Sequence, residues 1–462
     1  MIFTYISHVL LSCIIFSHSV ARIESFTPLP RYSVSSILVD SKLYFFGGWG
    51  KNPDESEGCQ NSVFYLDTLS SFSTLDNNIP WIDLTSIANL PVGTCWQVSA
   101  HDSQKNSIYI LEGLMINSSN QVNVSDTLVY SFDTKIQKWS KSMISGIAPP
   151  RRMELQISQD SSNIYMFGGL SGPLTGSQNT TWFNDMNILD IKSLSWLIVV
   201  PSGIDLPPPQ ADFTATILNN GMIVYIGGRQ ATNAYGSEIS YKQMNKIWTY
   251  DTKKSFWNLI VTSGTIPGVR TGHSAVLAMD GRIIVYGGKE NEELLSPATP
   301  DLAVLDTAST PPFQWSTPKA FNAPPILAHH SATLIGNVMI IAFGNVTQQT
   351  TVAPGPTSKV YLLDISNKSN YTWITSFNAN TLKPTSTTEQ YEDSTTTYSI
   401  KPIQPSDKVI SLNIALILGA AIGCTIAFII IVIITVLLLR RWLKYKQSSE
   451  NKGLSDISVS DN

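Results

Sequence analysis

The apolar positions of the chain fall into short runs that recur in a fixed order, and the clearest copy occupies residues 270–288, RTGHSAVLAMDGRIIVYGG. Runs rich in Val, Ile and Ala at 274–279 and 282–286 predict two strands, and Asp280-Gly281 between them is a hairpin signal. Two further strands are predicted downstream, at Leu302–Asp306 and Gln314–Ser316. The pattern therefore predicts a unit of four strands.

Three landmarks repeat in this order six times: a glycine signature that ends an apolar run, an acid that ends the next strand, and a tryptophan. The glycine signatures end at Gly48, Gly113, Gly169, Gly228, Gly288 and Asn345; Glu112 replaces the first glycine in the second unit and Asn345 the second glycine in the sixth. The acids are Asp67, Asp133, Asp190, Asp251, Asp306 and Asp364. The tryptophans, spaced 57 to 61 residues apart, are Trp81, Trp139, Trp196, Trp257, Trp315 and Trp373. Units that repeat in this way predict blades that bury one another around an axis.

These motifs resemble the kelch repeat over residues 31–377, most closely in the fifth unit. The resemblance implies an all-β, six-bladed kelch-type β-propeller at residues 22–377, in which the glycine pair lets strands pack closely and the tryptophan packs between blades. His273 and His330 take the GHS position of the repeat, which Glu154 and Phe213 take in the third and fourth units. The chain also resembles the extracellular propellers of attractin-like and fungal kelch membrane proteins.

The closure of the ring has two interpretations. Residues 23–26 precede the first unit and could pair with the last blade, whereas residues 373–377 already supply an outer strand there. The sequence does not decide between them.

Segments outside the propeller predict a type I single-pass protein of the cell membrane, with its amino terminus extracellular. Residues 1–21 read as a cleaved signal peptide, although no Lys or Arg precedes the apolar run; a short membrane anchor is the alternative. Residues 378–408, rich in Thr, Ser and Pro, predict an extended stalk. Residues 409–439 predict a transmembrane helix, and the basic residues in the tail at 440–462 place that tail in the cytoplasm.

Several positions suggest modification or assembly. Cys59 and Cys95 are candidates for a disulfide, but sequence alone cannot show whether they approach each other. Gly419 and Gly423 form a GxxxG pattern that suits dimerisation of the membrane helix, although small residues are common in such helices. Six sequons, candidates for N-glycosylation, all precede the membrane segment: Asn117, Asn123, Asn179, Asn345, Asn367 and Asn370.

Composition and motifs favour binding over catalysis. The net charge of −4 gives no indication of a nucleic-acid partner, and no cofactor is expected. Arg31, Arg151, Arg152 and Arg270 precede first strands; converging guanidiniums would suit an acidic ligand, whereas bonding to loop carbonyls is the structural alternative. We therefore expect a cell-surface recognition module for a protein or glycan, which is not an enzyme. The alternative is an extracellular carbohydrate oxidoreductase resembling galactose oxidase, with copper held by His and Tyr.

Overall fold

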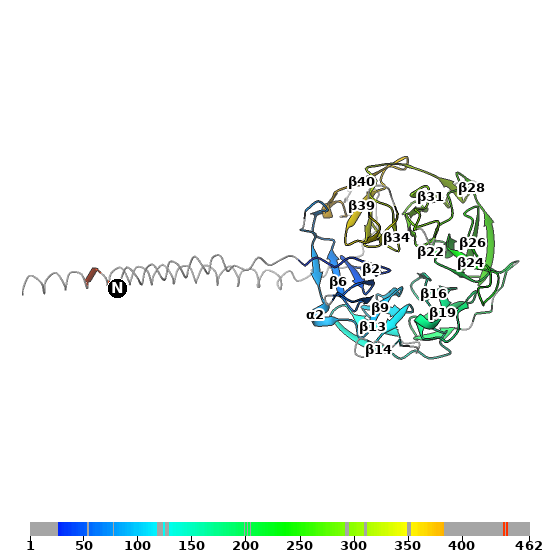
Figure 1. Ribbon diagram of the computed structural model, residues 1–462, viewed down its shortest axis with the longest axis horizontal. Helices are drawn as coiled ribbons and strands as arrows, with labels where there is room; N and C mark the ends of the chain where they lie inside the picture. Colours follow the sequence, from blue (N-terminus) through cyan, green and yellow to red (C-terminus); the bar gives the residue numbers. More distant parts are fainter. Residues whose placement is uncertain are drawn as a thin grey trace, which may run out of the picture. The chain divides into compact units, whose positions relative to one another are not determined.

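The computed structural model describes residues 26–382, apart from 53–54, 77, 118–122, 125–128, 198, 201, 204, 292–294, 309–311 and 349–352, together with 438, 440 and 441 (Figure 1). The chain divides into two units, Met1–Thr385 and Ser386–Asn462, and the first holds all the strands described below. The predicted signal peptide, the GxxxG pair, most of the stalk and tail, and all of the predicted span except Leu438 lie outside the described residues. Across the described part, no helix has the length and apolar character needed to cross a bilayer.

Six of the sheets that the described strands form have four or five strands each, and they are arranged in chain order around a ring (Figure 1). Within each, four successive strands pair antiparallel. Blade 1 contains β2 (Ser35–Val39), β3 (Lys42–Phe46), β6 (Val63–Asp67) and β8 (Trp81–Asp83). Blade 2 contains β10 (Val98–Asp102), β11 (Ser107–Leu111), β13 (Val129–Asp133) and β14 (Lys138–Ser142). Blade 3 contains β15 (Ile157–Gln159), β16 (Asn163–Phe167), β19 (Met186–Asp190) and β20 (Ser195–Leu197).

The second half of the ring repeats this order, with one extra strand in each of the last two sheets. Blade 4 contains β22 (Thr214–Ile217), β23 (Met222–Ile226), β26 (Lys246–Asp251) and β27 (Phe256–Val261). Blade 5 contains β29 (Ser274–Leu277), β30 (Arg282–Tyr286), β31 (Leu302–Asp306) and β32 (Gln314–Ser316), with β28 (Ser263–Gly264) added in parallel. Blade 6 contains β35 (Ser331–Ile335), β36 (Val338–Ala342), β39 (Val360–Asp364) and β40 (Asn370–Ile374), with β33 (Lys319–Phe321) added in parallel.

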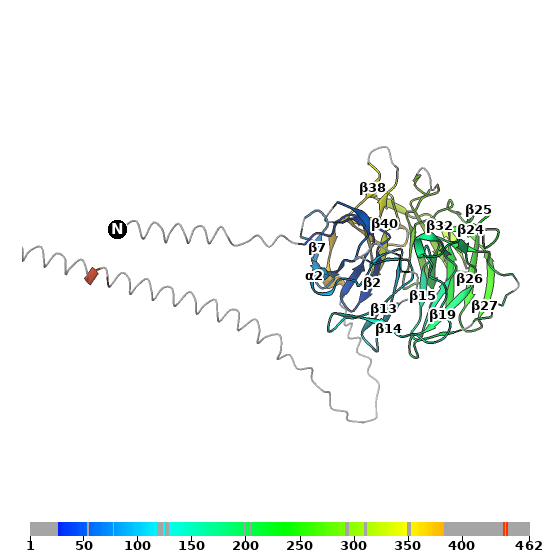
Figure 2. The same cartoon turned by 60° about the horizontal axis from the view of Figure 1, so that its bottom comes forward.

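Short accessory elements lie in the loops between second and third strands of a blade and in the segments that connect blades (Figure 2). Three-stranded ribbons join β1 (Arg31–Tyr32), β4 (Trp49–Lys51) and β5 (Glu57–Cys59); β21 (Gln210–Ala211), β24 (Arg229–Ala231) and β25 (Ile239–Tyr241); and β34 (Leu327–Ala328), β37 (Asn345–Val346) and β38 (Gly355–Pro356). Two-stranded pairs join β9 (Gly93–Cys95) with β12 (Leu114–Ile116), β17 (Leu170–Ser171) with β18 (Thr181–Trp182), and β7 (Phe72–Ser73) with β41 (Ser376–Phe377). The described helical turns are α2 (Thr85–Ala88), η1 (Pro173–Thr175) and η2 (Ala379–Leu382).

The tryptophans and acids occupy the same register in every blade. Each tryptophan lies on the outer strand, opposite the residue that precedes the recurring Asp: Leu66↔Trp81, Phe132↔Trp139, Leu189↔Trp196, Tyr250↔Trp257, Leu305↔Trp315 and Leu363↔Trp373. The Asp carboxylates accept backbone N–H groups of the following turn, as Asp133 does from Lys135 and Ile136 at 2.8 and 3.0 Å. The tryptophan and Asp repeats are therefore explained by packing and turn formation.

The glycine pairs are also confirmed, with one correction. Both members have positive φ, and the second donates its N–H to a carbonyl at the start of the next blade, as Gly48 does to Thr94 at 2.8 Å. In blade 6 the pair is Phe343–Gly344, with φ of 64° and 96°, and not Gly344–Asn345 as the sequence suggested. Gly344 donates its N–H to Arg31 of blade 1 at 2.8 Å, so this bond series runs around the whole ring.

No blade combines strands from the two ends of the described chain, because each takes its four antiparallel strands from one continuous stretch. The ring therefore closes through contacts between blade 6 and blade 1. β40 is the outer strand of blade 6, as one of the two closure interpretations required. β41 pairs with β7 of blade 1, where the rings of Phe72 and Phe377 stack at 5.2 Å. Phe26 instead packs on Phe64 of blade 1, with ring centroids 5.7 Å apart.

Two further predictions are resolved in blades 1, 2 and 5. Cys59 of β5 and Cys95 of β9 are joined by a disulfide, with their Cα atoms 5.2 Å apart. The predicted two-residue hairpin at Asp280-Gly281 is longer: β29 ends at Leu277, and the connection to β30 is 278–281.

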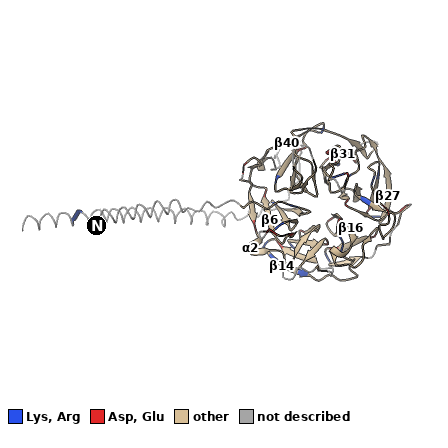
Figure 3. Ribbon diagram, in the orientation of Figure 1, with Lys and Arg blue, Asp and Glu red and all other residues tan. Residues whose placement is uncertain are grey.

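Charged residues of both signs are spread thinly over the ring (Figure 3).

Candidate functional site: the mouth of the channel

The recurring arginines lie between blades and bond to backbone carbonyls. Arg31, Arg152 and Arg270 are at most 2 % exposed. In each, Nε donates to a carbonyl two residues earlier, and Nη1 donates to the first glycine of that blade's own pair: Arg31 to Gly47 at 2.9 Å, Arg152 to Gly168 at 3.0 Å and Arg270 to Gly287 at 3.2 Å. Burial lowers the pKa of Arg31 to about 9, although Asp83 opposes the shift. These contacts match the structural alternative given for the arginines.

The structure also corrects which arginine of the third blade is equivalent to the others. The repeated position is that of Arg152 and not of Arg151, because the Arg152 carbonyl accepts the N–H of Gly113 as those of Arg270 and Arg31 accept the N–H groups of Gly228 and Gly344. Arg152 also pairs with Asp185 at 2.6 Å and lies over the ring of Phe183 at 3.7 Å. Arg151, 4 % exposed, points Nη1 toward the Glu112 carbonyl at 3.5 Å. None of the four arginines lines the cavity described below.

The other three blades fill the arginine position differently, with Thr94, Gln210 and Leu327, identified by the inter-blade bond from the preceding glycine pair. In blade 4, Gln210 accepts a hydrogen bond at 2.5 Å from Lys242, whose pKa burial lowers to about 7. In blade 2, Thr94 lies beside the Cys59–Cys95 disulfide. A cation or a covalent link thus replaces the arginine in these two blades.

Two residues after the arginine position, each blade places one residue in the left-handed backbone region, with φ between 51° and 61°. These six residues, which we call the rim, are Ser33, Trp96, Glu154, Asp212, Gly272 and His329. Only blade 5 has glycine, the residue that this conformation favours. The other five carry polar or aromatic side chains in spite of a backbone penalty of the order of 1 kcal/mol each.

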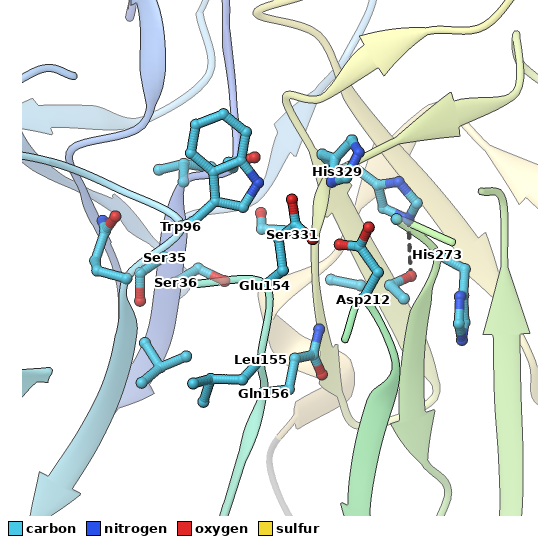
Figure 4. A pocket seen from close by; sticks show the side chains of 18 of the residues that line it. Ser35, Ser36, Trp96, Glu154, Leu155, Gln156, Asp212, His273, His329 and Ser331 are labelled. Carbon is cyan, nitrogen blue, oxygen red and sulfur yellow. Dashed lines mark hydrogen bonds between the residues drawn. The ribbon is translucent and has the colours of Figure 1, made fainter. Parts of the chain in front are cut away.

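The rim opens into a cavity of ≈ 250 Å³ at the start of the six innermost strands (Figure 4). Hydroxyls of Ser35, Ser36, Ser99, Ser274 and Ser331 contribute to its wall, together with the amides of Gln97 and Gln156. Figure 4 shows the side chains of Trp96, Glu154, Asp212 and His329 gathered around one opening. The mouth of the channel is therefore a polar, concave site to which all six blades contribute.

Two deeper histidines serve packing. His330 Nε2 lies 2.8 Å from Ser274 Oγ of the preceding blade, and His273 Nε2 lies 3.2 Å from Thr214 Oγ1. Burial lowers the pKa of His330 to about 3, with His329 adding to the shift. The register places Leu155, and not Glu154, at the equivalent position of blade 3, because Ile157 pairs with Met166 as Ala332 pairs with Ile341. Glu154 belongs instead to the rim.

The acidic side of the rim is formed by blades 3 and 4. Glu154 and Asp212 both form ion pairs with Arg229, the second at 3.1 Å. The Arg229 guanidinium also lies 5.5 Å from the centre of the Trp182 ring. Two carboxylates thus share one guanidinium, and the cluster has a formal charge of −1.

The aromatic side of the rim is formed by blades 1, 2 and 6. The Tyr32 ring lies 5.7 Å from Trp96, edge-on, and 6.3 Å from His329. Trp49 lies 6.2 Å from Trp96 and is paired with Cys59 in the β4–β5 ribbon. The disulfide therefore links β5, which follows Trp49 in the chain, to β9, which ends one residue before Trp96. In blade 5 the missing side chain leaves room for His329, since a Cβ at Gly272 would come within 3.0 Å of that imidazole.

The six sequons lie in two kinds of place in the blades. Asn117, Asn123, Asn179 and Asn345 lie between second and third strands, whereas Asn367 lies in the β39–β40 connection and Asn370 begins β40. Asn179, Asn367 and Asn370 are exposed, whereas Asn345 is half-buried in β37.

Sequence reasoning missed the rim because its members differ in chemistry from blade to blade. The available signal was position: each lies two residues after the arginine position, where the fifth unit has Gly272.

Two aromatic residues in the loops after the glycine pairs differ in exposure: Trp182 is buried, whereas Tyr235 is 84 % exposed. No group of three or more His, Cys, Asp or Glu side chains suited to a metal ion occurs among the residues with described positions.

The six four-stranded blades with repeated glycine pairs and tryptophans define a kelch-type β-propeller. The sequence profile of the Attractin/LZTR1 beta-propeller family matches residues 108–401, which is more than half of the chain. The chain therefore belongs to the Attractin/LZTR1 beta-propeller family.

Individual proteins match at lower identity. Human Kelch domain-containing protein 3 is 24 % identical over 262 residues, covering 56 % of this chain and 64 % of that protein. Kelch domain-containing protein 10 of Xenopus tropicalis is 23 % identical over 342 residues, covering 73 % and 76 %. Rho GTPase-activating protein gacHH of Dictyostelium discoideum is 28 % identical over 158 residues, covering 33 % of this chain and only 9 % of that protein. The chain thus spans less than two thirds of the first and third of these.

A solved structure supports the fold alone. The structure of YjhT superposes with a TM-score of 0.53 at 14 % identity, covering 75 % of this chain and 98 % of that one.

Proposed function

We propose that the propeller is a recognition module that holds a protein ligand at the mouth of its channel, and that the chain displays this module on the cell surface as a type I single-pass protein. Kelch-type propellers are generally protein-interaction modules, which favours a protein ligand. The predicted signal peptide, membrane span and basic tail support the proposed location.

The observation that carries the binding site is the set of rim residues. Five blades place Ser, Trp, Glu, Asp or His in a backbone conformation that glycine would adopt with less strain. Strained residues of this kind cluster at functional sites, because the side chain is needed where the backbone places it. Four of them, Trp96, Glu154, Asp212 and His329, place side chains that can bind a ligand around one concave opening (Figure 4).

The test is to remove the rim side chains without straining the backbone. The variant Trp96→Gly/Glu154→Gly/His329→Gly keeps residues that accept positive φ. The matched control is Asp40→Gly, which also has positive φ but lies in the β2–β3 turn, at the other end of the inner strand. A phage-displayed library of random twelve-residue peptides is selected on the full-length chain in detergent. We expect binders that the rim variant loses and the control keeps; binding that is indifferent to the rim would overturn the proposed site.

The location is tested separately. An epitope inserted beside the exposed Tyr235 should be stained by antibody on intact cells, and a carboxyl-terminal epitope only after permeabilisation. Staining of the Tyr235 epitope that required permeabilisation would overturn the cell-surface proposal.

A further inference from the structure

We infer that the ligand presents a cationic side chain, a guanidinium or an ammonium, that enters the mouth between the Glu154–Asp212 carboxylates and the aromatic side formed by Tyr32, Trp96 and His329. This inference rests on the proposed function and specifies its chemistry. It reverses the ligand expected from the arginines, since those arginines are buried and bonded to carbonyls.

The first argument is the charge at the rim. Glu154 and Asp212 both pair with the guanidinium of Arg229, so these three side chains together carry a formal charge of −1. The side chains of Glu154 and Arg229 are each 17 % exposed and that of Asp212 is 6 % exposed. Coulombic attraction is stronger in such a half-buried site than on an open surface, because water screens it less. A cation would neutralise the excess, whereas an anionic ligand would add to it.

The second argument is the aromatic side. The rings of Tyr32 and Trp96 lie 5.7 Å apart, and Tyr32 lies 6.3 Å from His329. Figure 4 shows the Trp96 ring and the His329 imidazole on opposite sides of the opening, with the Glu154 carboxylate between them. Cations bind aromatic faces within about 6 Å of the ring centre. The protein already uses this geometry elsewhere, with Arg229 over Trp182 at 5.5 Å.

The third argument is an unused acceptor in the cavity wall. Gln97 is 5 % exposed and donates through Nε2 to the Phe46 carbonyl at 2.5 Å, while its Oε1 has no hydrogen-bond partner among the residues that the structure describes. Ser33 Oγ, at the rim, is likewise buried without a partner. Buried polar atoms without partners are rare and destabilising, and the Gln97 amide oxygen can only accept, so a ligand with N–H donors would satisfy it. Guanidinium and ammonium groups supply donors only.

The experiment uses the peptides selected as above, assayed against charge variants of the full-length chain. We expect the rim-dependent peptides to share an Arg or Lys whose replacement by norleucine weakens binding about tenfold or more. Glu154→Gln and Asp212→Asn should each weaken binding, and Arg229→Gln should strengthen it several-fold because it leaves both carboxylates uncompensated. Asp40→Gly is again the control.

The opposite signs separate recognition from damage, since loss of structure would weaken binding in all three charge variants. Rim-dependent peptides that lack a basic residue, or an Arg229→Gln variant that binds more weakly than the wild type, would overturn the inference and leave the proposed function standing. Peptides that bind independently of the rim would overturn both. Displacement of rim-dependent peptides by a neutral oligosaccharide, with no effect of Arg229→Gln, would also overturn the cation and indicate a glycan.

Discussion

The arginine position and the rim lie two residues apart at the start of every blade, yet they differ in almost every respect. The arginine position is buried and carries Arg31, Arg152 and Arg270 in three blades. The rim is half-buried and carries a different residue in each blade. The arginine recurs because its task, bonding the carbonyl of the first glycine, is the same in each blade. The rim varies because its six members together form one site.

In a repeat protein, a residue type that recurs from unit to unit therefore stabilises each unit. A position whose residue type differs between units instead serves the function of the assembled ring. Four predictions test this contrast, beginning with the largest expected effect.

The first concerns the disulfide, which supports blade 2 where an arginine is missing. Replacement of both Cys59 and Cys95 by Ser should lower the free energy of unfolding by about 4 kcal/mol, because the bridge closes a loop with a sequence separation of 36. Chemical denaturation measures the loss. A reductant should lower the stability of the wild type and leave the double variant unaffected; equal sensitivity of both would contradict the prediction.

The second removes an arginine. Arg270→Met should lower the free energy of unfolding by about 3 kcal/mol, because it removes the buried guanidinium that donates hydrogen bonds to the carbonyls of Gly268, Gly287 and Pro300. Lys254→Met, at a side chain 79 % exposed, is the control and should change stability by less than about 0.5 kcal/mol. A similar small change for Arg270→Met would remove the structural explanation of the arginines.

The third prediction concerns the pH dependence of the free energy of unfolding that the buried His330 causes. Burial lowers the pKa of His330 to about 3, so the unfolded chain binds the proton first, and the folded state loses stability as pH falls from about 6.5 toward 3. At pH 5 this contribution is about 2 kcal/mol. His330→Gln, which keeps a hydrogen-bonding group near Ser274, should flatten the pH dependence of the urea midpoint between pH 7 and 4.5. An unchanged slope would show that His330 does not titrate in this way.

The fourth has the smallest expected effect on stability. His329→Gly should change the free energy of unfolding by less than about 1 kcal/mol, because relief of the left-handed strain offsets the added freedom of the unfolded chain. Thermal unfolding beside the wild type measures it. A loss above about 2 kcal/mol would place His329 among the residues that hold the blades, and the contrast with the arginine position would fail.

Most of the fold could be predicted from the sequence because its landmarks follow local rules. Trp315 and Asp306 are read directly from the repeat, since each blade needs an inter-blade ring and a turn cap at the same register. The shift to Phe343–Gly344 could not be predicted, because Phe343 adopts a positive φ that its residue type disfavours. Tertiary packing overrides local preference there: Phe343 is fully buried against Phe45 and Phe64 of blade 1.

The site could be predicted only in outline. The arginines chosen from the sequence precede the first strands, close to the rim, but they are buried, and Glu154 was aligned one position away from its true equivalent. A misalignment of one residue moves a side chain from the cavity rim to the blade interior, because successive residues of an extended chain face opposite sides. Which blade supplies which rim chemistry follows from the three-dimensional register and not from any one repeat.

The pairing of β41 with β7 determines how the ring responds to mechanical force. After Phe377 the described part of the propeller ends in the short η2 turn, whose Ala379 donates its N–H to Ser71 Oγ at 3.0 Å, so tension on the downstream segment reaches this contact, the two-residue ladder and the Phe72–Phe377 stack before it reaches blade 6. A force parallel to the two strands loads the hydrogen bonds of this ladder together, whereas a perpendicular force breaks them one after another. In either case the apolar cores of the blades are loaded only afterwards. In an optical-tweezers experiment that pulls on the carboxyl end, the seam between the first and last blades should yield first, with an extension far smaller than that of a whole blade.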